Sequence, residues 1–324
     1  MSDAIEWREA RLAAIRDLAP DIRLFEIAPA GPFVAPSPGS NIKVTVEIGG
    51  RPDTRSYSVV GPCRDGLWRI AVKRLRDGRG GSAYMWSLAP GARLVVATPA
   101  NHFGLMLGRP EYLLVAGGIG ITPIHGMALA LAERGARFRL LYGVRRREDM
   151  AFAGELAARL GDRLEIFVGA EGGRIELATE IARLAPGGEL YVCGPMPMLE
   201  EAKHLWHACG RPAELLRFET FGSGGRHAAQ PFTVHIPRLG REIAVPQNQS
   251  MLDALESAGI QVISDCRRGE CGLCALSVLE VDGLVDHRDV FFSDEEKAEN
   301  QKLCACVSRV VGRAITIDTA DRAA

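Results

Sequence analysis

The chain has 324 residues, of which 47% are hydrophobic, and its formal net charge is −1. That length predicts two or three domains, and the balanced charge argues against nucleic acid as the main partner, because no basic excess is available to neutralise phosphates. The sequence has no run of about 18 apolar residues to span a bilayer. The charged N-terminal segment MSDAIEWREARLAAI lacks the apolar stretch of a secretory signal. These features predict a soluble, cytoplasmic protein with no membrane partner.

The first predicted domain, residues 1–108, is an antiparallel β-barrel. Glycine and proline between its β-rich segments are typical of such a fold. These segments cover 41–48, 55–60, 67–73 and 92–97. The motif RSYS at 55–58 is weak alone, because an exposed arginine and a buried tyrosine are common in strands. It gains weight from RGGS at 79–82, which indicates a helix start whose N–H groups could cradle a phosphate.

The second predicted domain, residues 109–222, is an α/β domain with a parallel sheet. Its hydrophobic strands alternate with helix-prone stretches, which is the pattern of βαβ units. The strands are predicted at 112–117, 138–143, 164–168 and 189–193. The segment 223–231 is polar and glycine-rich, and we expect it to be a linker.

Two turns of this domain, GGIGITP at 117–123 and CGPMPML at 193–199, join a strand to a helix. Glycines in the first turn let a dinucleotide pyrophosphate approach the backbone at a helix N-terminus. Thr122 and Pro123 suit the start of that helix. The pattern is not the GxGxxG fingerprint, so glycines that serve only a tight turn are the alternative. The two turns together favour a nucleotide site.

The arginines of VRRRED, Arg145 to Arg147, follow the strand at 138–143, where selectivity for the adenosine ribose is expected to be set. They are compatible with the 2′-phosphate of NADPH. A solvated run of charge is an equally good interpretation.

The last predicted domain, residues 232–324, is a small β-grasp domain. Ser250 suits the N-cap of the helix MLDALESAG, with Leu252 and Leu255 on its buried face. The first two strands alternate as a hairpin. Strands are predicted at 232–237, 241–245, 275–281 and 314–318.

Five of the eight cysteines lie in this last domain. Three of them form the spacing C-x4-C-x2-C in the loop DCRRGECGLC, and Cys304 and Cys306 follow. Thiolates that converge on one short loop indicate a soft metal centre. This spacing is the plant-type [2Fe–2S] pattern, and zinc or a purely structural role is the alternative. Gly269 and Gly272 let the loop bring backbone N–H groups toward the sulfides.

The whole chain resembles the phthalate dioxygenase reductase and vanillate O-demethylase reductase type of flavoprotein, within the ferredoxin–NADP reductase superfamily. The resemblance rests on RSYS, RGGS, GGIGITP, CGPMPML and the cysteine loop. It implies a multidomain fold with a flavin barrel, an α/β nucleotide domain and a C-terminal ferredoxin domain. It also implies FMN as the flavin; FAD is the alternative, but the extra contacts to an adenine are not identified in this sequence.

For the flavin, the resemblance implies that Arg55 contacts the phosphate, Tyr57 packs on the ring system and Ser58 hydrogen-bonds near the reactive nitrogen. Gly81 and Ser82 would hold the phosphate. Glu219 belongs to the segment FETF, and burial against the barrel would explain this segment equally well. The implied flavin contacts are Arg55, Ser56, Tyr57, Ser58, Val72, Gly80, Gly81, Ser82, Glu219 and Phe221.

For the nucleotide, the resemblance implies that Cys193 lies near the site of hydride transfer, with Ser58 as the second residue along the transfer path. Met196 packs nearby. Proteins of this type mostly use NADH, which favours NADH over NADPH. The implied nucleotide contacts are Gly117, Gly118, Ile119, Gly120, Thr122, Pro123, Cys193, Gly194, Pro195 and Met196.

For the cluster, the ferredoxin family opens its last strand with a ligand in the form C-V-x-x, which matches CVSR at Cys306. Cys304 is the alternative fourth ligand. A short insertion relative to the family is expected in a turn at VDGL, residues 281–284. The implied ligands are Cys266, Cys271, Cys274 and Cys306.

The resemblance implies the reductase component of a two-component Rieske-type oxygenase. Hydride would pass from NADH to FMN, and single electrons would pass through the cluster to the oxygenase. Arg267 and Arg268 lie between two ligands, where they either recognise the partner or tune the cluster. A cytochrome or a diiron hydroxylase is the alternative acceptor. A redox-sensing regulator is disfavoured, because the sequence shows no DNA-reading element. A non-catalytic iron–sulfur carrier is disfavoured, because the flavin and nucleotide motifs are intact.

Overall fold

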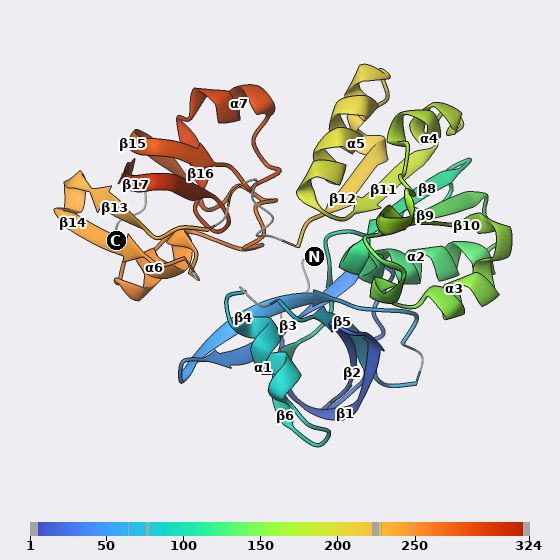
Figure 1. The fold of residues 1–324 in the computed structure, drawn as a ribbon. Helices are drawn as coiled ribbons and strands as arrows, with labels where there is room; N and C mark the ends of the chain where they lie inside the picture. The colour runs from blue at the N-terminus through green and yellow to red at the C-terminus, as the bar shows by residue number, and fades with distance from the viewer. Residues whose placement is uncertain are drawn as a thin grey trace. The chain divides into compact units, whose positions relative to one another are not determined.

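The computed structural model describes residues 6–63, 65–75, 78–221, 227, 229–247 and 249–319. The chain divides into two compact units, Met1–Glu219 and Thr220–Ala324. The first holds two sheets and the second holds one, as Figure 1 shows. The multidomain fold predicted from the sequence is confirmed, whereas the boundary at 108 stays a prediction. The predicted linker, residues 223–231, falls largely outside the described residues.

The first sheet is antiparallel, with strand order β4-β3-β6-β1-β2-β5. A bridge between Val59 and Ile70, together with a bond from Val60 N to Arg69 O (2.8 Å), closes it into a barrel. Inward-facing aliphatic and aromatic side chains of alternate residues fill its interior. The elements are β1 (Trp7–Ala19), β2 (Ile22–Pro29), β3 (Ser40–Ile48), β4 (Arg51–Ser58), β5 (Trp68–Lys73), α1 (Gly81–Ser87), β6 (Arg93–Ala97) and β7 (Ala100–Asn101), which pairs with β3.

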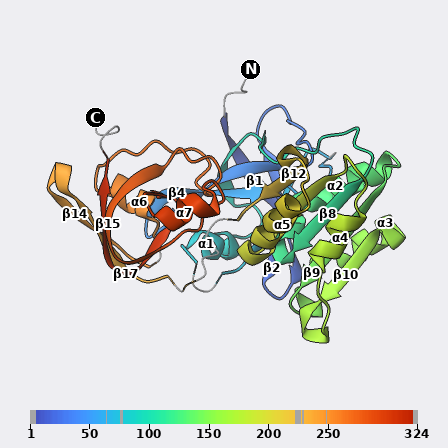
Figure 2. The ribbon, with the colours of Figure 1, turned by 90° about the horizontal axis from the view of Figure 1, so that it is seen from above.

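The second sheet is parallel, with strand order β10-β9-β8-β11-β12. Helices α2 and α3 cover one face and α4 and α5 the other (Figures 1 and 2), so its central strands β8 and β11 are buried along their whole length. The elements are β8 (Tyr112–Gly117), α2 (Ile121–Glu133), β9 (Phe138–Val144), α3 (Ala153–Leu160), β10 (Leu164–Val168), α4 (Leu177–Arg183), β11 (Glu189–Cys193), α5 (Met196–Ala208) and β12 (Leu216–Glu219).

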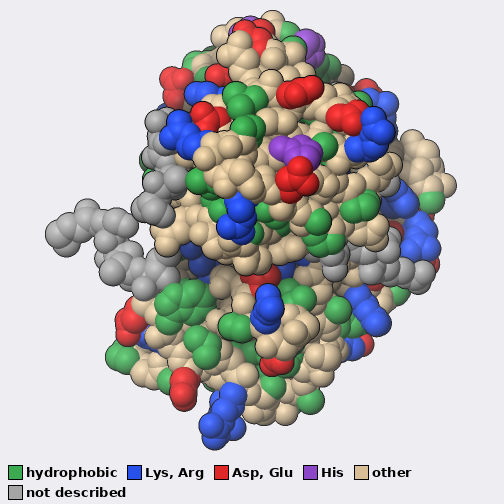
Figure 3. Space-filling model, turned by 90° about the vertical axis from the view of Figure 1, so that its left-hand side faces the viewer, with side chains coloured by type: hydrophobic (Ala, Val, Ile, Leu, Met, Phe, Trp, Pro, Cys, Tyr) green, Lys and Arg blue, Asp and Glu red, His purple; other side chains and the backbone are tan. Residues whose placement is uncertain are grey.

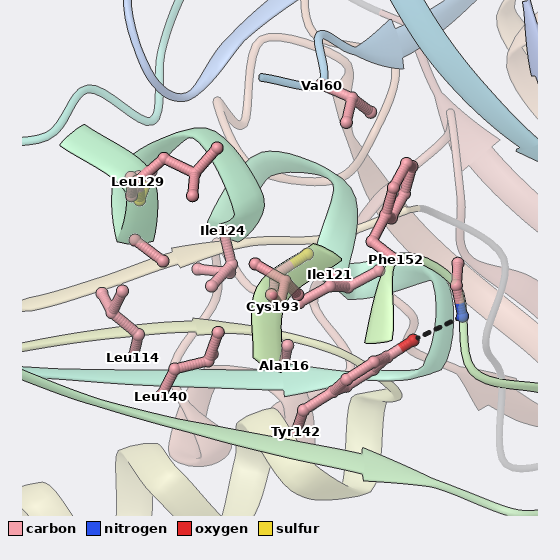
Figure 4. Close-up of a cluster of buried hydrophobic side chains, with 14 of the residues drawn as sticks. Val60, Leu114, Ala116, Ile121, Ile124, Leu129, Leu140, Tyr142, Phe152 and Cys193 are labelled. Carbon is pink, nitrogen blue, oxygen red and sulfur yellow. Dashed lines mark hydrogen bonds between the residues drawn. The ribbon is translucent and has the colours of Figure 1, made fainter. Parts of the chain in front are cut away.

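The core of this sheet lies under α2. Ile121 and Ile124 of the helix are fully buried in one cluster with Leu114 and Leu140 of the strands (Figure 4). Val60 of the barrel belongs to the same cluster, so the apolar core is continuous from the barrel to the parallel sheet. The turns at the ends of β8 and β11 are therefore anchored to a tightly packed hydrophobic core.

The second unit is a mixed sheet of order β14-β13-β17-β15-β16. Ser250 caps α6 as predicted: its Oγ accepts a bond from Asp253 N at 3.1 Å. Leu252 and Leu255 are fully buried, which confirms the predicted helix face. The elements are β13 (Phe232–Ile236), β14 (Arg241–Val245), α6 (Met251–Ser257), β15 (Ala275–Asp286), α7 (Asp294–Glu299), β16 (Lys302–Cys304) and β17 (Arg309–Asp318).

The turn expected at VDGL, residues 281–284, is wrong. These residues lie inside β15, which stays paired with β17 as far as Asp286. The register shifts between Asp282 and Gly283, where Gly283 faces Gly312 and both have positive φ. The Asp-Gly pair that suggested a turn forms a β-bulge instead.

Charges of both signs are interspersed on the face shown in Figure 3. Many charged side chains of the structure form ion pairs: Arg267, for example, contacts Asp253 (3.2 Å) and Glu256 (2.7 Å) of α6. None of the helices in the described part of the chain has the length and hydrophobicity that a membrane span requires.

Candidate functional site

Arg55 lies on β4 with its side chain directed at the start of α1. Its guanidinium binds Asp53 Oδ2 (2.6 Å) and donates to the carbonyl oxygen of Arg79 (3.0 Å). A Cβ atom on Gly81 would lie 2.6 Å from Arg55 Cγ, so only glycine fits beneath the arginine. This contact places a fixed cation next to the first turn of α1, which is where a flavin phosphate is predicted.

The turn before α1 is shaped by Gly80, which has φ +81° and precedes the helix. Ser82 Oγ accepts a bond from Leu75 N at 3.1 Å, which ties the helix start to the end of the neighbouring loop. The first N–H groups of any helix lack partners within it. The geometry is compatible with the predicted role of Gly80, Gly81 and Ser82 in holding a phosphate.

The remaining predicted flavin residues of the barrel lie on β4 and β5. Ser56 Oγ donates to Asn41 Oδ1 at 3.0 Å, and Val72 is buried. Burial raises the pKa of Tyr57, with the Arg55 charge opposing it, so the phenol stays protonated and can donate. Asn41 and Asp53 were not singled out from the sequence. Asn41 lies on β3 opposite Ser58, and Asp53 lies on β4 two residues before Arg55.

Ser58 and Glu219 meet at the junction of the barrel and the parallel sheet. Ser58 Oγ donates to Glu219 Oε2 at 2.8 Å, and both residues are almost fully buried. The structure therefore brings together two residues that were predicted separately. Phe221 belongs to the second unit, where its side chain is 38% exposed, and its predicted flavin contact stays a prediction.

The two nucleotide turns lie side by side. β8 and β11 are neighbours in the sheet, and Cys193 pairs with Ala116 at their carboxyl ends. The chain runs outward from β8 through β9 to β10 and then returns to β11, so these ends form the topological switch point, where open α/β sheets bind their ligands. A Cβ on Gly120 would lie 2.1 Å from the carbonyl oxygen of Cys193, and one on Gly117 would lie 2.6 Å from Pro195 Cδ. The glycines are therefore required for the two turns to touch.

Thr122, Cys193 and Met196 of these turns are buried. Thr122 Oγ1 donates to the carbonyl oxygen of Ile119 at 3.0 Å. The Cys193 side chain belongs to the hydrophobic core. Met198 was missed by the sequence interpretation, although it lies within CGPMPML: its sulfur would be 3.2 Å from a Cβ on Gly117 and 2.8 Å from one on Gly194. Gly118, Pro123 and Met196 occupy the same two turns.

Two of the three arginines after β9 are held by carboxylates. Arg146 contacts Glu148 (2.9 Å) and Asp149 (3.2 Å), and Arg147 makes two bonds to Glu171. Arg145 has no ion-pair partner within the described ranges. The arrangement favours the interpretation of this run as a solvated, paired surface.

The cysteine loop wraps around the sulfur of Cys266. The backbone N–H groups of Arg268, Glu270 and Cys271 all point at it, each 3.4 Å from Sγ. Such donors stabilise the negative charge of a thiolate ligand. No group of three or more His, Cys, Asp or Glu side chains in the described residues is arranged to hold a single metal ion, whereas a [2Fe–2S] cluster divides four thiolates between two irons.

Both glycines of the loop are in the left-handed region and closely packed. Gly269 has φ +77°, and its Cβ would lie 2.6 Å from Val307 Cγ2. Gly272 has φ +71°, and its Cβ would lie 2.3 Å from the ring of Phe291. The loop conformation therefore depends on glycine at both positions, as predicted. Phe291, which is half exposed, was not singled out by the sequence.

Cys304 and Cys306 both approach Cys274. Hydrogen bonds from the Cys304 and Cys306 thiols hold the pKa of Cys274 well below its usual range, at about 3. Cys306 also interacts with Cys266 and accepts from the N–H of Gly269, so it faces the loop. Cys304 instead neighbours the carboxylate of Asp289. This difference supports Cys306 as the fourth ligand.

Further residues fix the loop. Thr220 donates from N to Glu270 Oε1 (2.9 Å) and from Oγ1 to the carbonyl oxygen of Arg268 (3.0 Å). Arg268 and Glu270 also form an ion pair at 3.1 Å, and both are largely buried. Asp289 is fully buried and accepts from Ser308 Oγ and Phe292 N. The contacts from Thr220 and Ser308 join residues far apart in sequence, so no local pattern predicted them.

Two family models and several known proteins match this chain. Residues 234–311 match a model described as a 2Fe-2S iron-sulfur cluster binding domain, and residues 114–167 match an oxidoreductase NAD-binding domain. The chain is 37% identical to the phenoxybenzoate dioxygenase subunit beta of Ectopseudomonas oleovorans (95% of this chain, 96% of the relative). It is 36% identical to the heme-dependent oxidative N-demethylase beta subunit of Ectopseudomonas mendocina (96% and 98%).

Phthalate dioxygenase reductase is similar in both sequence and structure. The protein from Burkholderia cepacia is 34% identical, over 95% of this chain and 96% of the relative. A solved phthalate dioxygenase reductase, described as a modular structure for electron transfer from pyridine nucleotides to [2Fe-2S], superposes with a TM-score of 0.78 at 31% identity, covering 98% of both chains.

Proposed function

The chain belongs to the family of phthalate dioxygenase reductase-like oxidoreductases, and from that premise we propose that it is the reductase component of a two-component oxygenase. It takes hydride from NADH onto FMN and passes single electrons through a [2Fe–2S] cluster to the oxygenase. The observation that carries this function is that one chain holds both the paired turns GGIGITP and CGPMPML at a switch point and the three-cysteine loop with Cys306 near it. A nicotinamide gives up two electrons together and an iron–sulfur cluster takes one, and bound flavin supplies the exchange between them.

The residues at the barrel fit a flavin mononucleotide. Arg55 and the start of α1 provide a cation and free N–H groups for a single phosphate. Tyr57 provides a protonated aromatic side chain, and Ser58 provides a buried hydroxyl oriented by Glu219. These residues position the flavin; no proton transfer by a side chain is needed for hydride transfer itself. Proximity of the nicotinamide to the flavin is the main requirement.

The nucleotide is proposed to be NADH, bound at Gly117–Pro123 and Cys193–Met196. The two touching turns each lead into a helix, α2 or α5, and the first N–H groups of a helix have no partner within it, which suits a pyrophosphate. Pairing of Arg146 and Arg147 with carboxylates supports NADH, because a 2′-phosphate would have to compete with those carboxylates.

The cluster ligands are proposed to be Cys266, Cys271, Cys274 and Cys306. The converging N–H groups and the orientation of Cys306 toward the loop support this set.

The proposed domains are 1–108, 109–222 and 232–324, joined by a linker at 223–231. Limited proteolysis followed by mass spectrometry would test these boundaries.

The acceptor is proposed to be a Rieske-type oxygenase in the cytoplasm. Two relatives are named for phenoxybenzoate and phthalate dioxygenases, which supports a dioxygenase partner. A haem enzyme is the second candidate, because another relative of similar identity is named for a heme-dependent oxidative N-demethylase. Turnover of NADH with a purified Rieske oxygenase, compared with a haem oxygenase at the same concentration, distinguishes the two.

The decisive experiment is an anaerobic absorbance titration of the purified, cofactor-loaded protein with NADH and, separately, with NADPH. We expect flavin and iron–sulfur bands to bleach together with NADH and only slowly with NADPH. A protein whose flavin is reduced while the cluster bands persist would contradict the proposed electron path. A protein that binds no flavin after reconstitution would exclude the reductase function altogether.

A further inference from the structure

Thr220 contacts two residues of the cysteine loop. It is the first residue of the second unit and is 2% exposed. Its N–H donates to Glu270 Oε1 at 2.9 Å, and its Oγ1 lies 3.0 Å from both Glu270 Oε1 and the carbonyl oxygen of Arg268. The sequence interpretation gave Thr220 no role. It precedes residues 234–311, which match the 2Fe-2S model, so the loop is held by a residue from outside that match.

The same two loop residues supply donors to the first cysteine of the loop. The backbone N–H groups of Arg268 and Glu270 each lie 3.4 Å from Cys266 Sγ. The side chains of the two residues form an ion pair at 3.1 Å and are 12% and 18% exposed. Thr220 therefore holds the carbonyl oxygen of one donor residue and the carboxylate of the other.

The segment between the two donors is a flexible residue held at one point. Gly269 separates Arg268 from Glu270, and glycine restricts its backbone less than any other residue does. Its carbonyl oxygen accepts a bond from Val290 N at 2.9 Å, which holds the middle of the segment. The residues on either side need contacts of their own to keep their N–H groups directed at one sulfur. Thr220 supplies those contacts to both residues.

We propose that Thr220 is a positioning residue for the cluster. It holds Arg268 and Glu270 so that their N–H groups stay directed at the Cys266 sulfur, and this raises the reduction potential of the [2Fe–2S] cluster. The inference rests on the cluster and the ligand set proposed above. Reduction adds one negative charge to the cluster, and N–H donors at a ligand sulfur stabilise the more negative state.

Two substitutions separate the hydroxyl from the rest of the side chain. Thr220→Val removes the Oγ1 donor and keeps the branched shape, so the two N–H groups should lose their alignment and the cluster potential should fall. We expect a threefold to tenfold change in the one-electron reduction equilibrium, which corresponds to about 30–60 mV. Thr220→Ser keeps the hydroxyl, so its potential should stay closer to that of the natural protein.

The direction of the shift distinguishes this role from a general loosening of the fold. If Thr220→Val only admitted water to the cluster, the water would stabilise the additional negative charge of the reduced state and raise the potential. Loss of aligned N–H donors lowers it instead.

The measurement is a mediated redox titration of the full-length holoprotein with dithionite, followed by the EPR signal of the reduced cluster. Dithionite reduces the cluster without nucleotide. A natural protein with no cluster signal would therefore contradict the proposed function, whereas a normal signal with an unchanged potential in Thr220→Val contradicts this inference alone. Hydrogen–deuterium exchange gives a second readout, because the amides of the peptide that contains Arg268 and Glu270 should exchange faster in Thr220→Val.

Thr233→Val is the matched control. It makes the same exchange of hydroxyl for methyl on β13, where Thr233 pairs with Ala244 and Ala314. Its cluster potential and the exchange rate of the loop amides should match those of the natural protein.

Four results would overturn the inference. Thr220→Val could keep the potential of the natural protein, or its potential could rise. Thr220→Ser could fall as far as Thr220→Val, which would show that the hydroxyl is not the cause. A Thr220→Val protein that assembles no cluster would show that Thr220 is needed to form the site rather than to tune it.

Discussion

Ser58 Oγ donates a hydrogen bond to Glu219 Oε2 at 2.8 Å, across 161 positions of the sequence. Ser58 ends β4 of the barrel and Glu219 ends β12 of the parallel sheet. Both side chains are almost fully buried, so the Ser58 hydroxyl depends on Glu219 for the acceptor of its hydrogen bond. The proposed flavin and nucleotide sites are joined at this point.

Removing the carboxylate should slow flavin reduction. In Glu219→Ala, Ser58 loses its acceptor and its hydroxyl is no longer oriented. A buried group left without its partner costs about 1–3 kcal/mol, which predicts a roughly tenfold to hundredfold slower reduction by NADH in anaerobic stopped flow. Glu219→Gln keeps an acceptor and should retain most of the rate.

A double-mutant cycle tests whether the two residues act together. Ser58→Ala combined with Glu219→Ala should be scarcely slower than the slower single variant, since both remove one interaction. Fully additive effects would show that Glu219 acts on the flavin independently of Ser58.

Gly120→Ala should damage the nucleotide site. The added Cβ would lie 2.1 Å from the carbonyl oxygen of Cys193, so the two turns must separate. We expect the KM for NADH to rise about tenfold or more, because misplaced backbone N–H groups lose the pyrophosphate. Steady-state kinetics with ferricyanide as acceptor measure this change.

The matched control for Gly120→Ala is Gly154→Ala in α3. Gly154 has nothing within 4 Å of its Cβ position, and alanine favours the helix. Its KM should match that of the natural protein. If Gly120→Ala also left the KM unchanged, the glycine would not be needed for nucleotide binding.

Gly272→Ala should impair cluster assembly. Its Cβ would overlap the ring of Phe291, and its φ of +71° is strained for alanine. We expect the iron and sulfide content of the purified protein to fall to less than about half, because the loop between Cys271 and Cys274 is displaced. Iron analysis and absorbance of the cluster bands report the loss.

Combining Gly272→Ala with Phe291→Ala separates the two causes. The second change removes the clash but not the backbone strain, so part of the cluster content should return. No recovery at all would show that the positive φ, and not the aromatic ring, makes glycine necessary.

A buried histidine makes the stability of the first unit depend on pH. The His125 imidazole, whose Nε2 lies 3.5 Å from Glu155 Oε1, lowers the pKa of Glu155 below its ordinary value of 4.5, against the opposing effect of burial. A carboxylate with a lowered pKa in the folded state stabilises the protein above about pH 4.5, and this contribution is lost as the pH falls through the folded pKa. Glu155 is partly exposed, so we expect less than about 1 kcal/mol.

Denaturant unfolding of the flavin-loaded protein between about pH 3 and 6, followed by flavin fluorescence, measures this effect. Glu155→Gln should flatten the decline in the free energy of unfolding toward acid pH. Glu214→Gln, at an exposed position, is the control and should preserve the decline. Identical curves for the natural protein and Glu155→Gln would exclude the contribution.

The sequence predicted β11 and α6 correctly, because residues close together in the chain determine where each of them begins and ends. β11 begins and ends at the residues predicted, because the short apolar run LYVC, which follows Gly188-Glu189 and precedes Gly194, indicates a buried strand of an α/β domain. The capped helix α6 was predicted for the same kind of reason: Ser250 and Asp253 lie three residues apart and bond to each other.

Other features depend on distant partners and were missed. β1 reads WREARLAAIRDLA, in which only Ala10 and Leu12 are buried, so its alternation is hidden by charged residues. VDGL has the composition of a turn, but pairing with β17 holds it in a strand. Ser58 and Glu219 were predicted as site residues separately. Their contact was not predicted, because a local sequence pattern cannot indicate a partner so far away in the chain.

The facing glycines of the β15–β17 bulge constrain how this protein can vary. A side chain on Gly283 would meet the carbonyl oxygen of Val311 at 2.2 Å, and one on Gly312 would meet that of Asp282 at 2.0 Å. Each glycine is blocked by backbone atoms, including the Cα of the other glycine at 2.8 Å, so no compensating second substitution can make room. In a randomised library selected for the loaded ferredoxin domain, both positions should therefore return as glycine independently of one another, even though they lie on the strand pair and outside the cluster loop.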